Sequence, residues 1–258
     1  MQIISGKTNK LVKDTKKLIN SASARREQGL FVLEGARLCF DVLNSVYKVR
    51  QLFVTEKVMQ KYPDEVESLC NISGSAYIIT EEVSSKLSDT ESPQGIFAVC
   101  EMQNSKRPLG KRVLALDNLQ DPGNVGSVIR TAEALGIDSL IIYGGCDIYN
   151  PKVLRASMGS VLRMNIIQTD SLCDTLNALR SEYYCIVVTV PKQSARSISA
   201  VDFIAKTVCV IGNEANGVSK EVIDLADFTV TIPMKGRAES LNASVAASIT
   251  MWEMMRSG

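Results

Sequence analysis

The sequence predicts an α/β protein in which a small α/β domain precedes a larger domain built on a mostly parallel sheet. Short apolar runs rich in Val and Ile alternate with longer helical stretches along the chain, which is typical of layered α/β folds. After residue 112 the alternation becomes regular, as expected when crossover helices connect parallel strands. The stretch between the two parts is polar and carries Pro108 and Gly110. We therefore expect domains at 1–105 and 113–258, joined by a linker at 106–112.

The strands of the first domain are expected where apolar or β-branched residues cluster, at Phe31–Leu33, Gln51–Thr55, Ala76–Ile79 and Ile96–Cys100. The strands of the second domain are expected at Val113–Leu116, Ser139–Tyr143, Arg163–Ile167, Cys185–Val190, Thr207–Ile211 and Phe228–Ile232. In the first helix of this domain, Asn124 is placed to cap the N-terminus and Gly136 to end the helix. The final helix is expected at Leu241–Arg256.

The amino-acid composition excludes several classes of protein and of active site. Its 258 residues are 45% hydrophobic and 22% charged, which is ordinary for a soluble globular protein. No apolar run reaches the roughly 18 residues of a membrane span, and no long apolar stretch follows the basic N-terminus, so we expect a cytoplasmic protein without a secretory signal. The seven cysteines form no CxxC pair and are expected as reduced thiols. With no histidine present, a His base, a Ser-His nucleophile and a His-ligated metal are excluded, and we expect no metal site.

Positive charge gathers at the N-terminus although the net charge of the chain is only +1. Residues 1–26 hold a single acid, Asp14, against seven bases: Lys7, Lys10, Lys13, Lys16, Lys17, Arg25 and Arg26. A second basic group lies in the linker region: Lys106, Arg107, Lys111 and Arg112. Clustered cations favour a polyanion such as nucleic acid. A solvated helix face beside a polar linker explains the same pattern, and charge alone leaves the two interpretations equal.

Three polar clusters in the second domain each follow an expected strand: Asn118–Arg130, Ile211–Gly217 and Ile232–Ser244. Because the carboxyl ends of parallel strands meet at one edge of a sheet, these loops predict a ligand site. No GxGxxG occurs, and Gly6-Lys7-Thr8 lacks the first glycine of a phosphate loop, so dinucleotide and P-loop chemistry are excluded.

Individual residues of the clusters have both structural and functional interpretations. Arg130 either binds a phosphate or developing oxyanion, or pairs with Glu133 on the helix surface. Glu214 directly follows a buried strand, which favours a functional role over that of a surface turn residue. Ser240 or Asn242 either caps the last helix or leaves its free N–H groups to a ligand.

Taken together, these residues closely resemble the SpoU (TrmH-type) branch of the SPOUT RNA methyltransferases. The motifs that carry the resemblance are Asn124 with Arg130, Gly212-Asn213-Glu214 with Gly217, and Ile232-Pro233-Met234 with Ser240-Leu241-Asn242. The resemblance covers roughly Val113–Arg256. The N-terminal part is similar to the RNA-binding domain of rRNA-directed members through Phe31–Gly35 and Arg37. Asn165 departs from the pattern, because relatives often have proline there.

The resemblance implies a trefoil-knotted domain that methylates a ribose 2′-hydroxyl with S-adenosylmethionine. It implies catalytic roles for Arg130, Asn124, Glu214, Ser240 and Asn242. The implied cofactor contacts are Gly212, Asn213, Ile232, Met234 and Leu241. The implied partners are RNA and a second copy of the chain, which would dimerise through the helix after Asn124 and the Trp252 stripe and supply Arg130 to the other subunit's site.

The separate N-terminal domain favours large-subunit (23S) rRNA as the substrate, with tRNA as the alternative. A non-catalytic RNA-binding or ribosome-assembly protein of the same fold remains a rival, although such a protein has no reason to keep Arg130, Glu214 and Asn242 together. A nucleotide-dependent dehydrogenase is disfavoured because the glycine fingerprint is missing.

Overall fold

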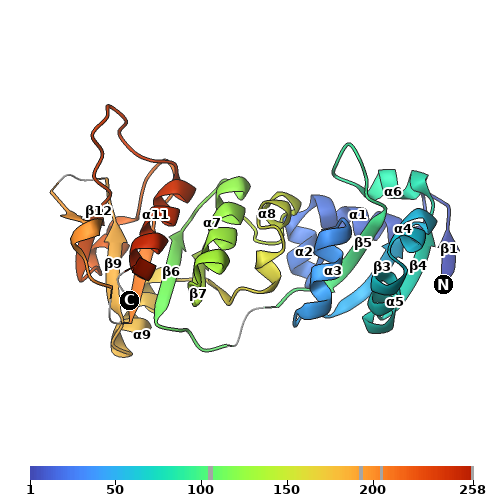
Figure 1. The fold of residues 1–258 in the computed structure, drawn as a ribbon, viewed down its shortest axis with the longest axis horizontal. Coiled ribbons are helices and arrows are strands. Elements are labelled where there is room, and N and C mark those ends of the chain that lie inside the picture. The colour runs from blue at the N-terminus through green and yellow to red at the C-terminus, as the bar shows by residue number, and fades with distance from the viewer. Residues whose placement is uncertain (104–106, 192–193, 204–205, 257–258) are drawn as a thin grey trace. The chain divides into compact units, whose positions relative to one another are not determined.

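The computed structural model describes residues 1–103, 107–191, 194–203 and 206–256 (Figure 1). Its contacts divide the chain into two units, of which the first is Met1–Gln103 with Asp147–Leu162 and the second is Asn104–Cys146 with Arg163–Gly258. Residues 147–162 thus pack with the N-terminal unit although they follow two strands of the second. Lys106, the first residue of the expected linker, lies outside the described residues. The boundaries expected from the sequence stay a prediction.

The first unit is built on a five-stranded mixed sheet in the order β1-β4-β3-β5-β2. Its strands are β1 (Gln2–Ile4), β2 (Leu30–Glu34), β3 (Val49–Val54), β4 (Ser75–Ile79) and β5 (Ile96–Glu101). Strands β1, β4 and β3 are parallel, whereas β5 is antiparallel to both β3 and β2. Central β5 reads IFAVC without alternation because it is buried on both faces.

Helices cover this sheet. They are α1 (Lys10–Asn20), α2 (Ala22–Gln28), α3 (Ala36–Asp41), α4 (Glu56–Lys61), α5 (Pro63–Ile72), α6 (Glu81–Leu87) and α8 (Pro151–Ala156), with short 3-10 turns η1 (Val42–Asn44) and η2 (Ser160–Leu162). Asn9 caps α1, and Ser21 caps α2, which ends at Gly29 with φ of 64°. The helix α1 buries Val12, Leu18 and Ile19 against β2 and α6 and turns Lys10, Lys13 and Lys17 to solvent.

The second unit is built on a seven-stranded sheet in the order β10-β12-β9-β11-β6-β7-β8. Every pair of neighbouring strands in it is parallel. The strands are β6 (Arg112–Asp117), β7 (Ser139–Tyr143), β8 (Ile166–Thr169), β9 (Cys185–Thr189), β10 (Arg196–Ser197), β11 (Thr207–Ile211) and β12 (Phe228–Thr231). Central β11, TVCVI, is buried throughout, as expected of a strand covered on both faces.

The elements that cover this sheet are α7 (Pro122–Leu135), α9 (Leu172–Ser181), α10 (Lys220–Asp224), α11 (Ala243–Arg256) and the 3-10 turn η3 (Ile198–Ala200). Helices α7 and α11 pack side by side (Figure 1). On the other face, α9 and α10 contribute Leu172, Leu176, Leu179 and Val222 to the core. The crossover helices leave the carboxyl ends of the strands at one edge of the sheet.

The mostly parallel α/β fold predicted from the sequence is confirmed. The expected strand at Arg163–Ile167 is wrong by three residues, because β8 begins at Ile166. The side chain of Asn165 is buried instead and donates to Ser139 Oγ and the Pro108 carbonyl, which fixes the turn before the strand. The short strands β1 and β10 were not predicted. The knot that the resemblance implies stays a prediction.

Candidate active site

A cavity of about 450 Å³ lies at the carboxyl ends of β9, β11 and β12. Loops from all three strands line it, together with the first turn of α11. All five residues expected to bind a cofactor line the cavity: Gly212, Asn213, Ile232, Met234 and Leu241. Glu214 and Ser240 lie on its wall as well. The two loops that the sequence places about 20 residues apart therefore form one site.

The turn that follows β11 is closed by its own backbone. The N–H of Asn213 donates to the Gly217 carbonyl at 3.0 Å, and the N–H of Gly217 donates back to the Asn213 carbonyl at 2.9 Å. Gly217 has φ of 68°, a conformation that glycine adopts without strain. A Cβ at Gly212 would lie 2.2 Å from the Gly217 carbonyl carbon, so only glycine fits. The glycines thus let the backbone form the cavity wall.

Glu214 joins this turn to the start of α7. Its carboxylate accepts hydrogen bonds from the backbone N–H of Gln120 at 3.1 Å, from that of Asp121 at 3.2 Å and from Asn124 Nδ2 at 3.0 Å. Partial burial raises the pKa of Glu214, but the hydrogen bonds from Asn124, Gln120 and Asp121 outweigh it, so the pKa is lowered. The side chain is therefore an anion at neutral pH.

Asn124 connects Glu214 to the start of the last helix, α11. Because its Nδ2 donates to Glu214, its Oδ1 is left as an acceptor, and Asn242 Nδ2 donates to it at 3.0 Å. Asn242 Oδ1 in turn accepts from the backbone N–H of Ser244 at 2.9 Å and from that of Val245. Glu214, Asn124 and Asn242 therefore form one hydrogen-bonded chain that links the three polar clusters.

The structure corrects the expected N-cap of helix α7. Asn124 does not cap α7, because Asp121 is the N-cap and its Oδ1 accepts from the Asn124 N–H at 2.8 Å. Pro122 occupies the first helical position, where its missing N–H costs nothing. Asn124 therefore lies within the first turn, and its side chain is free to bridge Glu214 and Asn242. Asn242 does cap α11, as one of the two candidates, and Gly136 ends α7 with φ of 76°.

Arg130 lies away from these residues. Six residues along a helix from Asn124 turn it by about 240° relative to that side chain. Arg130 is exposed and forms no hydrogen bond or ion pair with the residues that the structure describes, nor does it line the cavity. Its expected surface partner Glu133 pairs with Arg163 at 2.8 Å instead. Among the described residues of one chain, Arg130 is thus an unpaired cation outside the cavity.

Some lining residues were not singled out in the sequence. Thr189, Val190 and Pro191 form the cavity wall at the end of β9. The strand itself was expected, and because β9 lies between β12 and β11, its end must lie at the same edge. The order of the strands in the sheet would have identified these three residues, but the sequence alone does not give that order. Asp117, at the end of β6, is also buried and accepts from the N–H and Oγ of Ser219.

The basic residues of the first unit differ in exposure. Arg25 is 3% exposed, its guanidinium bonded to Asp147 at 2.7 Å and to the carbonyls of Leu18 and Ile19. Its expected role as an RNA contact is not supported, because these partners occupy the side chain. The ammonium of Lys16 donates to the carbonyls that end α6. Lys7 pairs with Glu82 at 3.3 Å. The remaining predicted contacts are exposed: Lys10, Lys13, Lys17, Arg26 and Arg37.

Two general features bear on the chemistry. Among the described residues, no group of three or more Cys, Asp or Glu side chains is arranged to hold a metal ion. Nor does the described part of the chain contain a helix that is both long and apolar enough to span a membrane.

Comparison with known proteins identifies the family of this chain. The SpoU rRNA Methylase family model matches residues 111–252, and the MRM3-like substrate binding domain matches residues 9–98. The chain is 31% identical over 257 residues to the 23S rRNA (guanosine(2553)-2′-O)-methyltransferase RlmP of Bacillus subtilis, covering 98% of this chain and 99% of that one. It is 31% identical over 251 residues to a 23S rRNA (uridine(2479)-2′-O)-methyltransferase of Streptomyces viridochromogenes, covering 93% and 87%.

Solved structures agree over the whole length. The AdoMet-bound rRNA methyltransferase from Sinorhizobium meliloti superposes with a TM-score of 0.88 at 29% identity, covering 99% of this chain and 97% of that one. The SpoU methyltransferase AviRb from Streptomyces viridochromogenes with AdoMet gives 0.86 at 29%, covering 96% and 97%. The fold and the site therefore define an RNA methyltransferase. The chain belongs to the SpoU rRNA methylase family.

Proposed function

We propose that this chain transfers a methyl group from S-adenosylmethionine to a ribose 2′-hydroxyl of 23S rRNA. The observation that carries the proposal is the hydrogen-bonded chain from Glu214 through Asn124 to Asn242 beside the 450 Å³ cavity. A protein that only bound RNA would not need three separate loops joined beside a pocket of this size. Relatives with this architecture are named as 23S rRNA 2′-O-methyltransferases.

The choice of rRNA over tRNA rests on the first unit. The relatives named for 23S rRNA match both parts of the chain, over 98% and 93% of its length. A TrmH/SpoU tRNA modifying enzyme of A. aeolicus matches only 58% of it, with a TM-score of 0.54. An additional substrate-binding domain is more useful to an enzyme that must find one nucleotide in a large folded RNA. We place this activity in the cytoplasm, where the seven cysteines, all free in the structure, remain reduced.

The cavity suits the proposed methyl donor. Ile211, Ile232 and Leu241 supply apolar surface for an adenine ring, and the backbone of Gly212 and its neighbours supplies hydrogen bonds at close approach. Its volume lies within the roughly 300–1,000 Å³ typical of small-molecule sites. When bound, the donor supplies an electrophilic methyl group on a positively charged sulfur.

The protein's own residues then have two tasks. The first is to hold the ribose so that its 2′-oxygen lies in line with the methyl group, which lowers the barrier by fixing the attack geometry. We assign this task to Ser240, which lines the cavity, and to Asn124 and Asn242, which are hydrogen-bonded to each other and, through Asn124, to the lining residue Glu214. The oxygen–methyl bond would form as the sulfur–methyl bond breaks, and the hydroxyl proton would pass to a solvent water molecule. The second task is to stabilise the negative charge that develops on the oxygen.

We assign that second task to Arg130. A guanidinium stays protonated in proteins, so Arg130 acts as a cation that holds the neighbouring phosphate and stabilises the alkoxide, and not as a base. Because it lies outside the cavity of its own chain, we propose that Arg130 reaches the site of a partner subunit. Two exposed apolar side chains on α11 support a dimer: Val245 is 46% and Trp252 57% exposed, and seven residues apart they share one helix face. Helix α7, which carries Arg130, packs beside α11.

Single-turnover methylation of an unmodified 23S rRNA transcript tests the proposal. The wild-type chain should modify one ribose, and mapping of 2′-O-methyl sites in cells with and without the gene should find the same nucleotide. Arg130→Lys should slow the step about tenfold, because an ammonium cannot replace a planar, bidentate guanidinium. Mixing Arg130→Lys with an excess of a cofactor-site variant, Gly212→Ala, should restore activity only if Arg130 acts across subunits. No methylation by the wild-type chain would overturn the proposal.

A further inference from the structure

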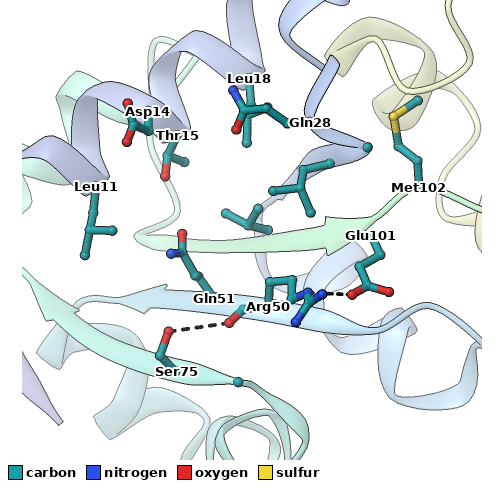
Figure 2. Close-up of a pocket in the computed structure, with 14 residues that line it drawn as sticks. Leu11, Asp14, Thr15, Leu18, Gln28, Arg50, Gln51, Ser75, Glu101 and Met102 are labelled. Atoms are coloured by element: carbon teal, nitrogen blue, oxygen red, sulfur yellow. Dashed lines mark hydrogen bonds and ion pairs between the residues drawn. The ribbon is translucent and has the colours of Figure 1, made fainter. Parts of the chain in front are cut away.

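The first unit contains a second cavity, of about 810 Å³, for which the proposed chemistry gives no role. It lies between α1 and the edge of the sheet at which β3 and β4 begin (Figure 2). One wall is α1, whose Leu11, Asp14, Thr15 and Leu18 recur at the spacing of a single helix face. The opposite wall comes from the strands and includes Gln51 and Ser75.

The lining combines apolar surface with groups that hydrogen-bond. Leu11 and Leu18 supply the apolar part, and the side chains of Gln51 and Ser75 supply donors and acceptors. In Figure 2 the Gln51 amide points from its strand toward α1. A planar ligand with polar edges matches such a lining, because its faces can contact the apolar side chains and its edges the amides.

The charges in this cavity argue against a phosphate as the occupant. Its titratable lining residues are Asp14, Arg50 and Glu101. The Arg50 guanidinium is paired with Glu101 at 2.5 Å, which leaves the Asp14 carboxylate without a compensating charge among the described residues that line the cavity. A carboxylate repels phosphate but accepts hydrogen bonds from an amino group. The occupant should therefore be neutral and carry N–H donors.

The same helix offers a surface for phosphates next to the cavity. Lys10, Lys13 and Lys17 repeat at three- and four-residue spacing, so they form a stripe on α1, about a third of a turn away from the cavity face. All three are exposed and make no ion pair with the described residues. A polynucleotide can thus lie along this lysine stripe while one of its bases enters the cavity.

We propose that this cavity binds one unpaired base of the substrate RNA, with the flanking phosphates on the lysine stripe. The inference rests on the proposed function for the identity of the RNA. Asp14 favours a base with an exocyclic amino group over uracil, since carboxylates accept from such groups. Recognition of a splayed, unpaired base is the usual way in which proteins read RNA sequence. The first unit would then select the site, and the second would modify it.

The test compares variants of the full chain for binding to an unmodified 23S rRNA transcript without cofactor. Ser75→Phe should fill the cavity and lower affinity about tenfold, in the range expected when one base no longer binds. Ser68→Phe on α5 is the matched control, because both serine hydroxyls donate to a backbone carbonyl but Ser68 lies outside the cavity. Gln51→Ala should lower affinity in the same direction by less, and it protects the test against a Ser75→Phe variant that fails to fold.

Salt dependence separates the two parts of the surface. Ser75→Phe removes no charge and should leave the salt slope of binding unchanged. Replacing Lys10, Lys13 and Lys17 by Gln should instead reduce the slope by about 0.7–0.9 for each phosphate that the protein no longer neutralises. With a 6-thioguanosine-substituted transcript, whose base keeps an exocyclic amino group, crosslinks should fall on α1 and β3 and disappear in Ser75→Phe. Wild-type affinity in both Ser75→Phe and Gln51→Ala would overturn this inference alone. Absence of methylation by the wild-type chain would instead overturn the proposed function.

Discussion

Replacing Asn124 by Asp tests the hydrogen-bonded chain with almost no change of shape. Asn124 Nδ2 donates to Glu214 at 3.0 Å, so Asn124→Asp puts a carboxylate oxygen where an N–H was. Two unit charges at that separation repel by roughly 1.4 kcal/mol in bulk water and by about 5.5 kcal/mol at an effective dielectric constant of 20. Glu214 is exposed, so the lower value applies, and the missing hydrogen bond adds about 1 kcal/mol. The sum of about 2.4 kcal/mol corresponds to roughly a 50-fold effect.

The assay is single-turnover methyl transfer to the 23S rRNA transcript at saturating S-adenosylmethionine, with calorimetric titration of the cofactor in parallel. Asn124→Asp should lose roughly 50-fold in rate or in cofactor affinity. Asn177→Asp adds the same charge to an exposed position on α9 and should behave as wild type. If Asn124→Asp keeps both quantities within about twofold of wild type, the contact with Glu214 does not organise the site.

Three further variants are informative. Gly212→Ala places a Cβ 2.2 Å from the backbone of the same turn and should abolish cofactor binding by calorimetry, whereas Gly236→Ala meets no atom within 4 Å and should bind normally. Folding lowers the pKa of Glu214, so its contribution to stability is fully present above its ordinary value of 4.5 and is lost as pH falls through the lower folded value. Glu214→Gln should therefore unfold more readily than wild type in urea at neutral pH, with a difference that shrinks below pH 4.5; a difference that stays undiminished in more acidic buffer would contradict this. Arg25→Ala removes a buried guanidinium that pairs with the half-buried Asp147 and bonds to the carbonyls of Leu18 and Ile19, and should cost about 3 kcal/mol of unfolding free energy, while Arg26→Ala should leave stability unchanged and weaken RNA binding.

The sequence predicted the second unit well because its signals are local. Central strands such as Thr207–Ile211 are continuous apolar runs, and each ends in Gly, Asn or Pro. Such runs are the mark of a parallel sheet covered on both faces, so the strand ends and their meeting at one edge followed directly. The lining residues in the loops after β11 and β12 were thus predicted from the sequence, whereas those at the end of β9 were not.

The rest depended on contacts between distant residues. Arg25 and Arg26 are adjacent and chemically alike, yet one is buried against Asp147 and the other is exposed. Nothing in the local pattern distinguishes them, because the partner lies 122 residues away. The predicted N-cap of α7 was wrong for a different reason. Asp121 and Asn124 are both good N-cap residues, and Pro122, which is favoured at the first helical position, makes the preceding Asp121 the N-cap.

The chain of Glu214, Asn124 and Asn242 also bears on when activity can arise during folding. Its two side-chain contacts join residues 90 and 118 positions apart. Contacts of such long range close large loops and form late. The last of them requires α11, the final described helix, to be in place and capped. Folding intermediates that already hold the sheet would lack the site, so the gain of cofactor binding should coincide with the packing of α11 and report completed folding of this unit.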